Sequence, residues 1–458
     1  MSVQQTDSTS SNFNSGTEPS SIPDVLRLLK EHDIRFLNFQ FVDILGVTKS
    51  VEVPASQFDK SLDRGVTFDG SGIEGFTRVE ESDLLLRPDP STFRVLPWEQ
   101  AGQRSGRMIC DVQRANGSDF EGDPRAALRR SIEKLSEHGY TAQIGAEVEF
   151  YLTDPRNGHD RNSSSAKRAG YFDPLPEDRE EVARREMVVM LEALGFEVES
   201  SHHDRGAGQH GIDFRHSDPL KAADNLTTLK SVVRVVARRH GLEASFMPKP
   251  LTSQPGCGLH THHSLWHEGR NVFHDPERRD GLSDLLRSYV AGVLRSARGM
   301  CAVTNPLVNS YKRLVPGSSA PVHTAWSLQN RSALVRIPPA RDGGTRCEIR
   351  MPDPAANPYL AFSVQIAAGL AGIAEELVPP ESVNTNVWTM SSRERQRLGI
   401  EELPRNLGEA LDTLARDRLI RGALGEHIFS HFTNSKRAEF ESYLAHVHPW
   451  ELERYADQ

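Results

Sequence analysis

Two carboxylates stand two positions apart in the run Gly145–Tyr151, which reads Gly-Ala-Glu-Val-Glu-Phe-Tyr. In a strand, side chains at positions i and i+2 leave the same face about 7 Å apart. Glu147 and Glu149 would repel each other there unless a cation lay between them. Mg²⁺ or Mn²⁺ suits such oxygen ligands. A solvated strand face explains the same pattern equally well, so this run alone leaves both interpretations open.

A histidine cluster lies in Gly256–Ser264, which reads Gly-Cys-Gly-Leu-His-Thr-His-His-Ser. On a strand, His260 and His262 share one face. Single histidines are more often structural, but three within four positions beside glycine-rich turns favour a binding site. A His-x-His pair with Glu268 downstream is also compatible with a cupin-like iron site.

Basic side chains gather in the neighbouring runs Asn309–Gly317 and Asn330–Arg336. Arginine forks bind carboxylate and phosphate oxygens through paired hydrogen bonds, and they stabilise the charge that grows during phosphoryl transfer. The alternative is a surface salt-bridge network, which would contribute little to stability. The basic residues are Lys312, Arg313, Arg331 and Arg336.

Arg346, Glu348 and Arg350 alternate along a predicted strand, so one carboxylate stands between two guanidiniums on the same face. This arrangement keeps Glu348 ionised and available to a cation. Pro354 and Pro358 predict that the strand ends and that a helix begins here.

Gly70–Gly75 fits the pattern G-x-G-x-x-G, but no βαβ unit surrounds it and the match is weak. The sequence contains neither a Walker A motif nor a G-x-S-x-G motif. If the protein uses ATP, metals and arginines must therefore hold the phosphates.

The composition argues against a nucleic-acid-binding protein and against a membrane-spanning one. A net charge of −9 over 458 residues argues against a nucleic-acid surface, which needs clustered Lys and Arg. The four cysteines are far apart and form no CxxC motif, which is typical of reduced, cytosolic proteins. No apolar run approaches the length of a membrane span. Residues 1–22 have the composition of a disordered tail rather than a signal peptide, so we expect a cytoplasmic protein.

Helices and strands must position the candidate site residues described above. Alternating residues predict strands at 35–43 and 49–53 with a turn between them, and a short amphipathic helix at 24–32 precedes them. A polar stretch at 116–123 predicts a boundary between a domain at 23–118 and a larger one at 119–458. The fold class is therefore α+β, with an antiparallel sheet in the larger domain. Helical spacing predicts a helix at 124–139, and the clearest helices are predicted at 219–240 and 358–376.

From Pro23 to Tyr455 the chain resembles the bacterial type I glutamine synthetase family. The resemblance implies a small N-terminal β-grasp domain and a large catalytic domain with a curved antiparallel sheet. It also implies a homo-oligomer of two stacked hexameric rings, a dodecamer whose active sites lie between neighbouring subunits. The motifs that carry it are Phe68–Gly70, Glu81–Asp83, Glu147–Phe150, Phe246–Pro250, Asn309–Gly317, Asn330–Ser332 and Arg350–Tyr359.

The resemblance implies an ATP-dependent ligase that activates the γ-carboxylate of L-glutamate, or of a close analogue, as an acyl phosphate for attack by an amine. It implies two Mg²⁺ or Mn²⁺ ions. The ligands of the ion at the nucleotide phosphates would be Glu147, His260 and Glu348. The ligands of the second ion would be Glu149 and Asp204.

The other implied roles are binding and transfer. Substrate would be held by Gly256, His262, Arg313 and Arg350. Nucleotide would be held by Lys249, Ser264, Arg331, Arg336 and Arg346. The residues carried over as catalytic are Asp69, which would bind the incoming ammonium, Arg331 and Arg350.

Four positions depart from the family pattern. Asp204 and Gly211 stand where the family has glutamate ligands of the second ion, so we expect that ion to bind more weakly, with water filling the gap at Gly211. Ser319 replaces a glutamate that helps deprotonate ammonium. Gly72 replaces a serine beside Asp69.

These departures predict a γ-glutamyl amide ligase that uses an amine other than ammonia, because a less basic nucleophile needs less help with its proton. The alternatives are a conventional glutamine synthetase and a degenerate homologue that binds nucleotide or partners without turnover. Trp388 stands where adenylylated members carry a tyrosine, so we expect no covalent control by that route.

Overall fold

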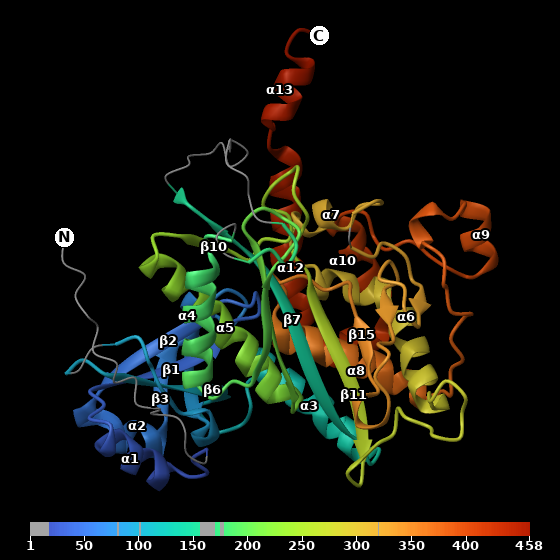
Figure 1. The fold of residues 1–458 in the computed structure, drawn as a ribbon. Helices are drawn as coiled ribbons and strands as arrows, with labels where there is room; N and C mark the ends of the chain where they lie inside the picture. Colours follow the sequence, from blue (N-terminus) through green and yellow to red (C-terminus); the bar gives the residue numbers. More distant parts are fainter. Residues whose placement is uncertain (1–17, 80–81, 100–101, 156–169, 175–177, 319) are drawn as a thin grey trace.

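The computed structural model of the chain describes residues 18–79, 82–99, 102–155, 170–174, 178–318 and 320–458. It contains two β-sheets, one in each half of the molecule (Figure 1). The smaller sheet has the strand order β2-β1-β6-β4-β3, with β5 paired to β6. Its strands are β1 (Phe36–Val42), β2 (Thr48–Pro54), β3 (Val66–Asp69), β4 (Asp83–Pro88), β5 (Arg94–Val95) and β6 (Ser105–Arg114).

The first hairpin shows how the sequence builds this sheet. β1 and β2 pair antiparallel from Phe36 opposite Pro54 to Val42 opposite Thr48. The turn between them is closed by the buried carboxylate of Asp43, whose Oδ1 accepts from the backbone N–H groups of Leu45 and Val47 at 3.0 and 2.9 Å. β1 also pairs in parallel with β6, which joins the hairpin to the rest of the sheet.

The larger sheet has the order β13-β14-β15-β11-β7-β9-β8 and carries most of the predicted site. All its pairings are antiparallel except β13 with β14, so the sheet is mixed rather than purely antiparallel. β10 pairs with β7, and β12 pairs with β11. Its strands are β7 (Thr141–Thr153), β8 (Val198–His203), β9 (Gln209–Ser217), β10 (Glu243–Ser245), β11 (Leu259–His267), β12 (Arg270–Asn271), β13 (Trp326–Ser327), β14 (Val335–Arg336) and β15 (Cys347–Ile349).

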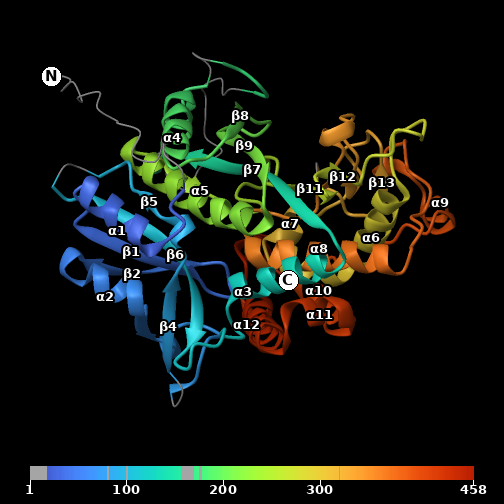
Figure 2. The same ribbon diagram turned by 90° about the horizontal axis from the view of Figure 1, so that it is seen from below.

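Helices cover this sheet and form most of the remaining core (Figure 2). The helix Pro358–Ala374, which follows the last site strand, is apolar on all sides and almost fully buried. It packs closely on the helix Asp284–Thr304, since a Cβ at Gly292 would lie 2.1 Å from the carbonyl oxygen of Ala368. The last helix projects from the body of the molecule (Figure 1). The helices are α1 (Ile22–Glu31), α2 (Phe58–Arg64), α3 (Pro124–Glu137), α4 (Glu181–Ala193), α5 (Pro219–Arg239), α6 (Asp284–Thr304), α7 (Ser310–Arg313), α8 (Pro358–Ala374), α9 (Ser392–Arg397), α10 (Leu407–Arg416), α11 (Arg418–Leu424), α12 (Glu426–Ala445) and α13 (Pro449–Tyr455).

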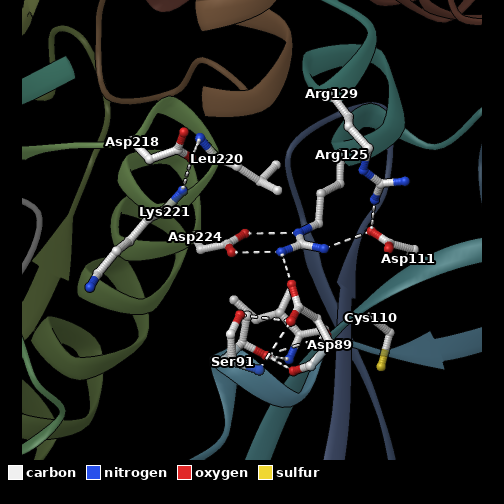
Figure 3. A network of polar contacts seen from close by, with 12 residues as sticks. Asp89, Ser91, Cys110, Asp111, Arg125, Arg129, Asp218, Leu220, Lys221 and Asp224 are labelled. Carbon is white, nitrogen blue, oxygen red and sulfur yellow. Dashed lines mark hydrogen bonds and ion pairs between the residues drawn. The ribbon is translucent and has the colours of Figure 1, made fainter. Parts of the chain in front are cut away.

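A buried arginine joins the two halves (Figure 3). The guanidinium of Arg125, at the start of α3, contacts Asp111 at 2.6 Å and Asp89 at 2.7 Å, both in the smaller half. It also makes two bonds of 3.0 and 3.1 Å to Asp224 on α5. One positive charge therefore holds three carboxylates from both halves.

The predicted hairpin and the helices expected at 24–32, 124–139, 219–240 and 358–376 are present within one or two residues at most ends. Residues 1–17 of the predicted tail lie outside the described residues, and Glu18 pairs with Arg94 and Lys221. The predicted domain boundary falls in the loop between β6 and α3. Within the described ranges, no helix is long and apolar enough to span a bilayer.

Candidate active site

Adjacent strands of the larger sheet position the first group of predicted site residues. Glu147 on β7 lies opposite His260 on β11, and His262 on β11 lies opposite Glu348 on β15. Directly opposite residues point to the same face, as do residues two apart on one strand. The register therefore places all four side chains on one face of the sheet.

Three of these side chains converge on one point. His260 Nδ1 lies 3.1 Å from Glu147 Oε2 and 3.5 Å from Glu348 Oε1. One potential ligand atom from each residue lies within 4.8 Å of the others. The structure thus brings together the trio expected to share a cation. Glu268, which a cupin-like site would need, lies in the exposed turn after β11 instead.

The surrounding charges keep both carboxylates of this trio ionised. Burial would raise the pKa of Glu348, but Arg350 and the nearby histidines outweigh it and lower the pKa to about 2. Arg336 donates to the other oxygen of Glu348 at 2.7 Å. Burial is likewise outweighed at Glu147, where hydrogen bonds from His260 and His262 lower the pKa below its ordinary value. Two ionised carboxylates and a half-buried imidazole form a ligand set that could hold Mg²⁺ or Mn²⁺.

A second pair of carboxylates, Glu149 and Asp204, lines one pocket together with His260. Glu149 Oε2 accepts from the backbone N–H of Gly258 at 2.7 Å and from Gln209 Nε2 at 3.2 Å. Burial and the neighbouring Asp204 raise the pKa of Glu149 to about 8. Two facing carboxylates without a cation between them have this effect, and a divalent ion would reverse it.

A side chain from the adjacent strand lies over Gly211. Gly211 on β9 lies opposite Glu149 on β7 and opposite His202 on β8. A Cβ at Gly211 would lie 2.6 Å from Cε1 and 2.7 Å from Nε2 of His202. The imidazole of His202 therefore lies over the position that a side chain at Gly211 would occupy. Sequence reading missed His202, and only the register of β8 on β9 reveals it.

Several of these groups, though not Glu147, Glu348 or Gly211, line one pocket with a volume of about 310 Å³, a size that suits a small substrate. Its wall also includes His202 and Trp388. The predicted site residues in its lining are Glu149, Asp204, Gly256, His260, Arg331 and Arg350.

Other predicted residues lie beside the pocket or away from it. Arg346 Nε donates to His262 Nδ1 at 3.2 Å, next to the first trio. Arg313 is buried and donates to the carbonyls of Met351 and Arg350 at 2.8 and 3.1 Å, so its described bonds are to backbone rather than into the pocket. Lys249 Nζ donates to the carbonyl of Gln254.

Ser264 is buried and accepts from Trp266 Nε1 at 3.0 Å, so its hydroxyl is engaged within the sheet. Asp69 ends β3 in the smaller sheet, is exposed, and caps the turn that follows by accepting from Ser71. The departure at Ser319 lies outside the described residues.

A second cluster of potential ligands was not anticipated. It consists of Asp178, His203 and His210, all buried. Arg184 already supplies a cation here, because its Nη1 lies 2.5 Å from Asp178 Oδ2 and 2.9 Å from His210 Nδ1. His203 donates from Nδ1 to the carbonyl of Asp204 at 2.6 Å. The cluster therefore supports the backbone of Asp204 rather than offering a vacant cation site.

Comparison with known proteins agrees with this geometry. Residues 33–115 match the family model described as glutamine synthetase, beta-Grasp domain, and residues 121–455 match glutamine synthetase, catalytic domain. The chain is 50% identical over 436 residues to a Thermus thermophilus protein named Glutamine synthetase, covering 94% of this chain and 98% of that protein. A protein of the same name from Clostridium saccharobutylicum is 46% identical over 435 residues, with coverages of 95% and 98%. A solved structure described as a GmaS/ADP complex is similar with a TM-score of 0.86 at 31% identity, covering 96% of this chain and 100% of that one.

Proposed function

The chain belongs to the glutamine synthetase family of ATP-dependent carbon–nitrogen ligases, and we propose that it joins the γ-carboxylate of L-glutamate to ammonia. The observation that carries the proposal is the convergence of Glu147, His260 and Glu348 within 4.8 Å beside a substrate-sized pocket. Relatives that align along nearly the whole chain at 46–50% identity bear the name Glutamine synthetase, which favours ammonia as the nitrogen donor.

The reaction has two steps. In the first, the glutamate γ-carboxylate attacks the γ-phosphorus of ATP, a new O–P bond forms, and the bond to ADP breaks. In the second, ammonia attacks the carbonyl carbon of the γ-glutamyl phosphate, inorganic phosphate leaves, and the nitrogen gives up a proton. A divalent cation, when bound, neutralises phosphate charge in this chemistry.

The chain's own residues would position the reactants. Glu147, His260 and Glu348 would hold the cation at the nucleotide phosphates, and Glu149 with Asp204 would hold the second. Arg331 and Arg350 line the pocket, where guanidiniums can orient carboxylate and phosphate oxygens. Arg336 donates to Glu348, and Arg346 donates to His262 beside the first trio, so both would help hold the phosphates there.

The subunit assembly is part of the same proposal. Asp69, expected to bind ammonium, is exposed in the smaller sheet and does not line the pocket of its own chain. This placement supports an arrangement in which Asp69 completes the site of a neighbouring subunit in stacked hexameric rings. Light scattering coupled to size-exclusion chromatography should then give a mass close to that of twelve chains.

An amine other than ammonia, which the sequence analysis placed first, is the second candidate. Gly72 supports it, because a Cβ there would meet nothing within 4 Å and the loop beside Asp69 is open. Proteins named Glutamine synthetase share 46–50% identity with nearly the whole chain, so ammonia takes precedence.

A panel of nucleophiles tests the two candidates. Phosphate release from ATP would be measured with Mg²⁺, glutamate and either ammonium, a primary alkylamine, an amino alcohol or a polyamine. We expect the highest kcat/KM with ammonium. Higher kcat/KM with one of the other amines would replace the proposal by the second candidate, and ATP binding without turnover on any amine would indicate the degenerate homologue.

A further inference from the structure

The two neighbours of Arg331 form a turn that is closed by their own side chains. Asn330 Oδ1 accepts from the backbone N–H of Ser332 at 2.9 Å and from its hydroxyl at 2.8 Å. The same turn occurs at Asn116 and Ser118, where the two distances are 3.0 and 2.8 Å. That turn is exposed, whereas the turn around Arg331 lines the active-site pocket. Turns of this kind are common local motifs, so the turn alone indicates no function.

The turn in the pocket makes two further bonds, which cross to a distant part of the chain. Asn330 Nδ2 donates to the carbonyl of Thr385 at 2.6 Å. The hydroxyl of Ser332 accepts from the backbone N–H of Val387 at 3.3 Å. Among the described residues, the side chains of the turn at 116–118 make no such bond to another segment. The residues on both sides of the pocket arginine are therefore tied to one remote segment.

The segment that receives these bonds, residues 383–387, is itself firmly held. Val387 is fully buried and packs in a small apolar cluster with Ala325. At the other end of the segment, the backbone N–H of Val383 donates to the carbonyl of Trp326 on β13 at 2.8 Å. The bonds from the turn therefore end on a buried support that is attached to the larger sheet.

The backbone of Arg331 is held at a third point, because its carbonyl accepts from Arg350 Nε at 3.1 Å. The side chain of Arg331 is long and exposed, so its guanidinium can adopt many positions unless the backbone is fixed. We propose that Asn330 and Ser332 are positioning residues, which fix the backbone of Arg331 on the segment 383–387 so that its guanidinium meets the phosphoryl group during transfer. The inference rests on the role proposed for Arg331 in the ligase reaction.

A double-mutant cycle on phosphate release with ammonium separates positioning from direct contact with substrate and from general structural support. Asn330→Ala should lower kcat about 10- to 100-fold and change the KM for ATP less than about twofold, because a misplaced guanidinium is missed mainly in the transition state. In an Arg331→Met background, the same substitution should change kcat less than about twofold, because no guanidinium is left to position. The matched control is Asn116→Ala, which opens the same kind of turn outside the pocket lining and should leave kcat unchanged.

Ser332→Ala provides a second cycle, which does not depend on the folding of Asn330→Ala. It removes the bond to the backbone of Val387, and its loss of kcat should likewise disappear in the Arg331→Met background. A loss that persists in that background would overturn the positioning role, as would native kcat in both alanine variants or in Arg331→Met itself. None of these outcomes would affect the ligase proposal, which would fail instead if the native chain turned over no amine.

Discussion

The Arg125 network and the active-site pocket both gather several carboxylates, but they neutralise them differently. In the network, one guanidinium buried to 4% exposure contacts Asp89, Asp111 and Asp224 at 2.6–3.0 Å (Figure 3). Around the pocket, Glu348 is paired with Arg336 and Arg350. The described residues include no lysine or arginine within ion-pair distance of the other three carboxylates, Glu147, Glu149 and Asp204.

The pKa values follow this difference. Burial would raise the pKa of Asp89, but Arg125 and two hydrogen bonds from Ser91 bring it below its ordinary value. Glu149 has no such partner, and burial with Asp204 raises its pKa to about 8. A carboxylate cluster that contains its own cation holds the fold together, whereas one that lacks it requires a cation from solution. Asp178 with Arg184 belongs to the first kind.

Removal of Glu348 should have the largest effect on activity. Glu348→Ala deletes a proposed ligand and leaves Arg336 and Arg350 without their shared carboxylate. We expect kcat to fall by a factor of about 10² to 10³, with loss of the tighter Mn²⁺ binding event. The control is Glu402→Ala, which removes a half-exposed carboxylate paired with Arg405 away from the pocket. Retention of tight Mn²⁺ binding in Glu348→Ala would exclude it as a ligand.

Removal of Arg125 should act on stability rather than on metal binding. Arg125→Met leaves Asp89 and Asp224 without an ion-pair partner and Asp111 with Arg129 alone, which should cost about 3–5 kcal/mol of unfolding free energy. Urea denaturation measures the loss, and Mn²⁺ affinity should be unchanged in the folded variant. Arg129→Met is the comparison, because Arg129 is more exposed and should cost less. A lower Mn²⁺ affinity in Arg125→Met would show that the Arg125 network contributes to metal binding, contrary to this prediction.

Added metal should stabilise the pocket and not the network. Mn²⁺ at about 100 times its Kd should raise the unfolding free energy by about 2.7 kcal/mol. The same increment should appear in Arg125→Met, because the two clusters are independent. Thermal melts with and without a chelator provide the measurement, and an increment that vanishes in that variant would show that the clusters are coupled.

Gly72→Ser should have the smallest effect on the fold. A Cβ at this position meets nothing within 4 Å, so the stability change should stay within about 0.5 kcal/mol. If the loop beside Asp69 selects the amine, the variant should lose activity with bulky amines while keeping it with ammonium. Equal losses of activity with bulky amines and with ammonium would show that this loop does not select the amine.

The strand alternation in the sequence was enough to place Glu147 and Glu149, and separately His260 and His262, on common faces. Proline and capping residues likewise located α3, α5 and α8. The counterpart of Gly211 was out of reach, because it depends on the register that sets His202 opposite it. The Arg125 network was also hidden, since Asp89 and Asp224 are far apart in the sequence and charge alone does not pair them.

The central claim is that Glu147, His260 and Glu348 bind one divalent cation at the phosphates of ATP. Anomalous diffraction at the manganese edge, from crystals grown with Mn²⁺ and a non-hydrolysable ATP analogue, tests it most directly. The account predicts a manganese peak about 2.1 Å from an oxygen of each glutamate and from a nitrogen of His260, next to the analogue's phosphates. A bound analogue with no manganese between these three side chains would contradict it.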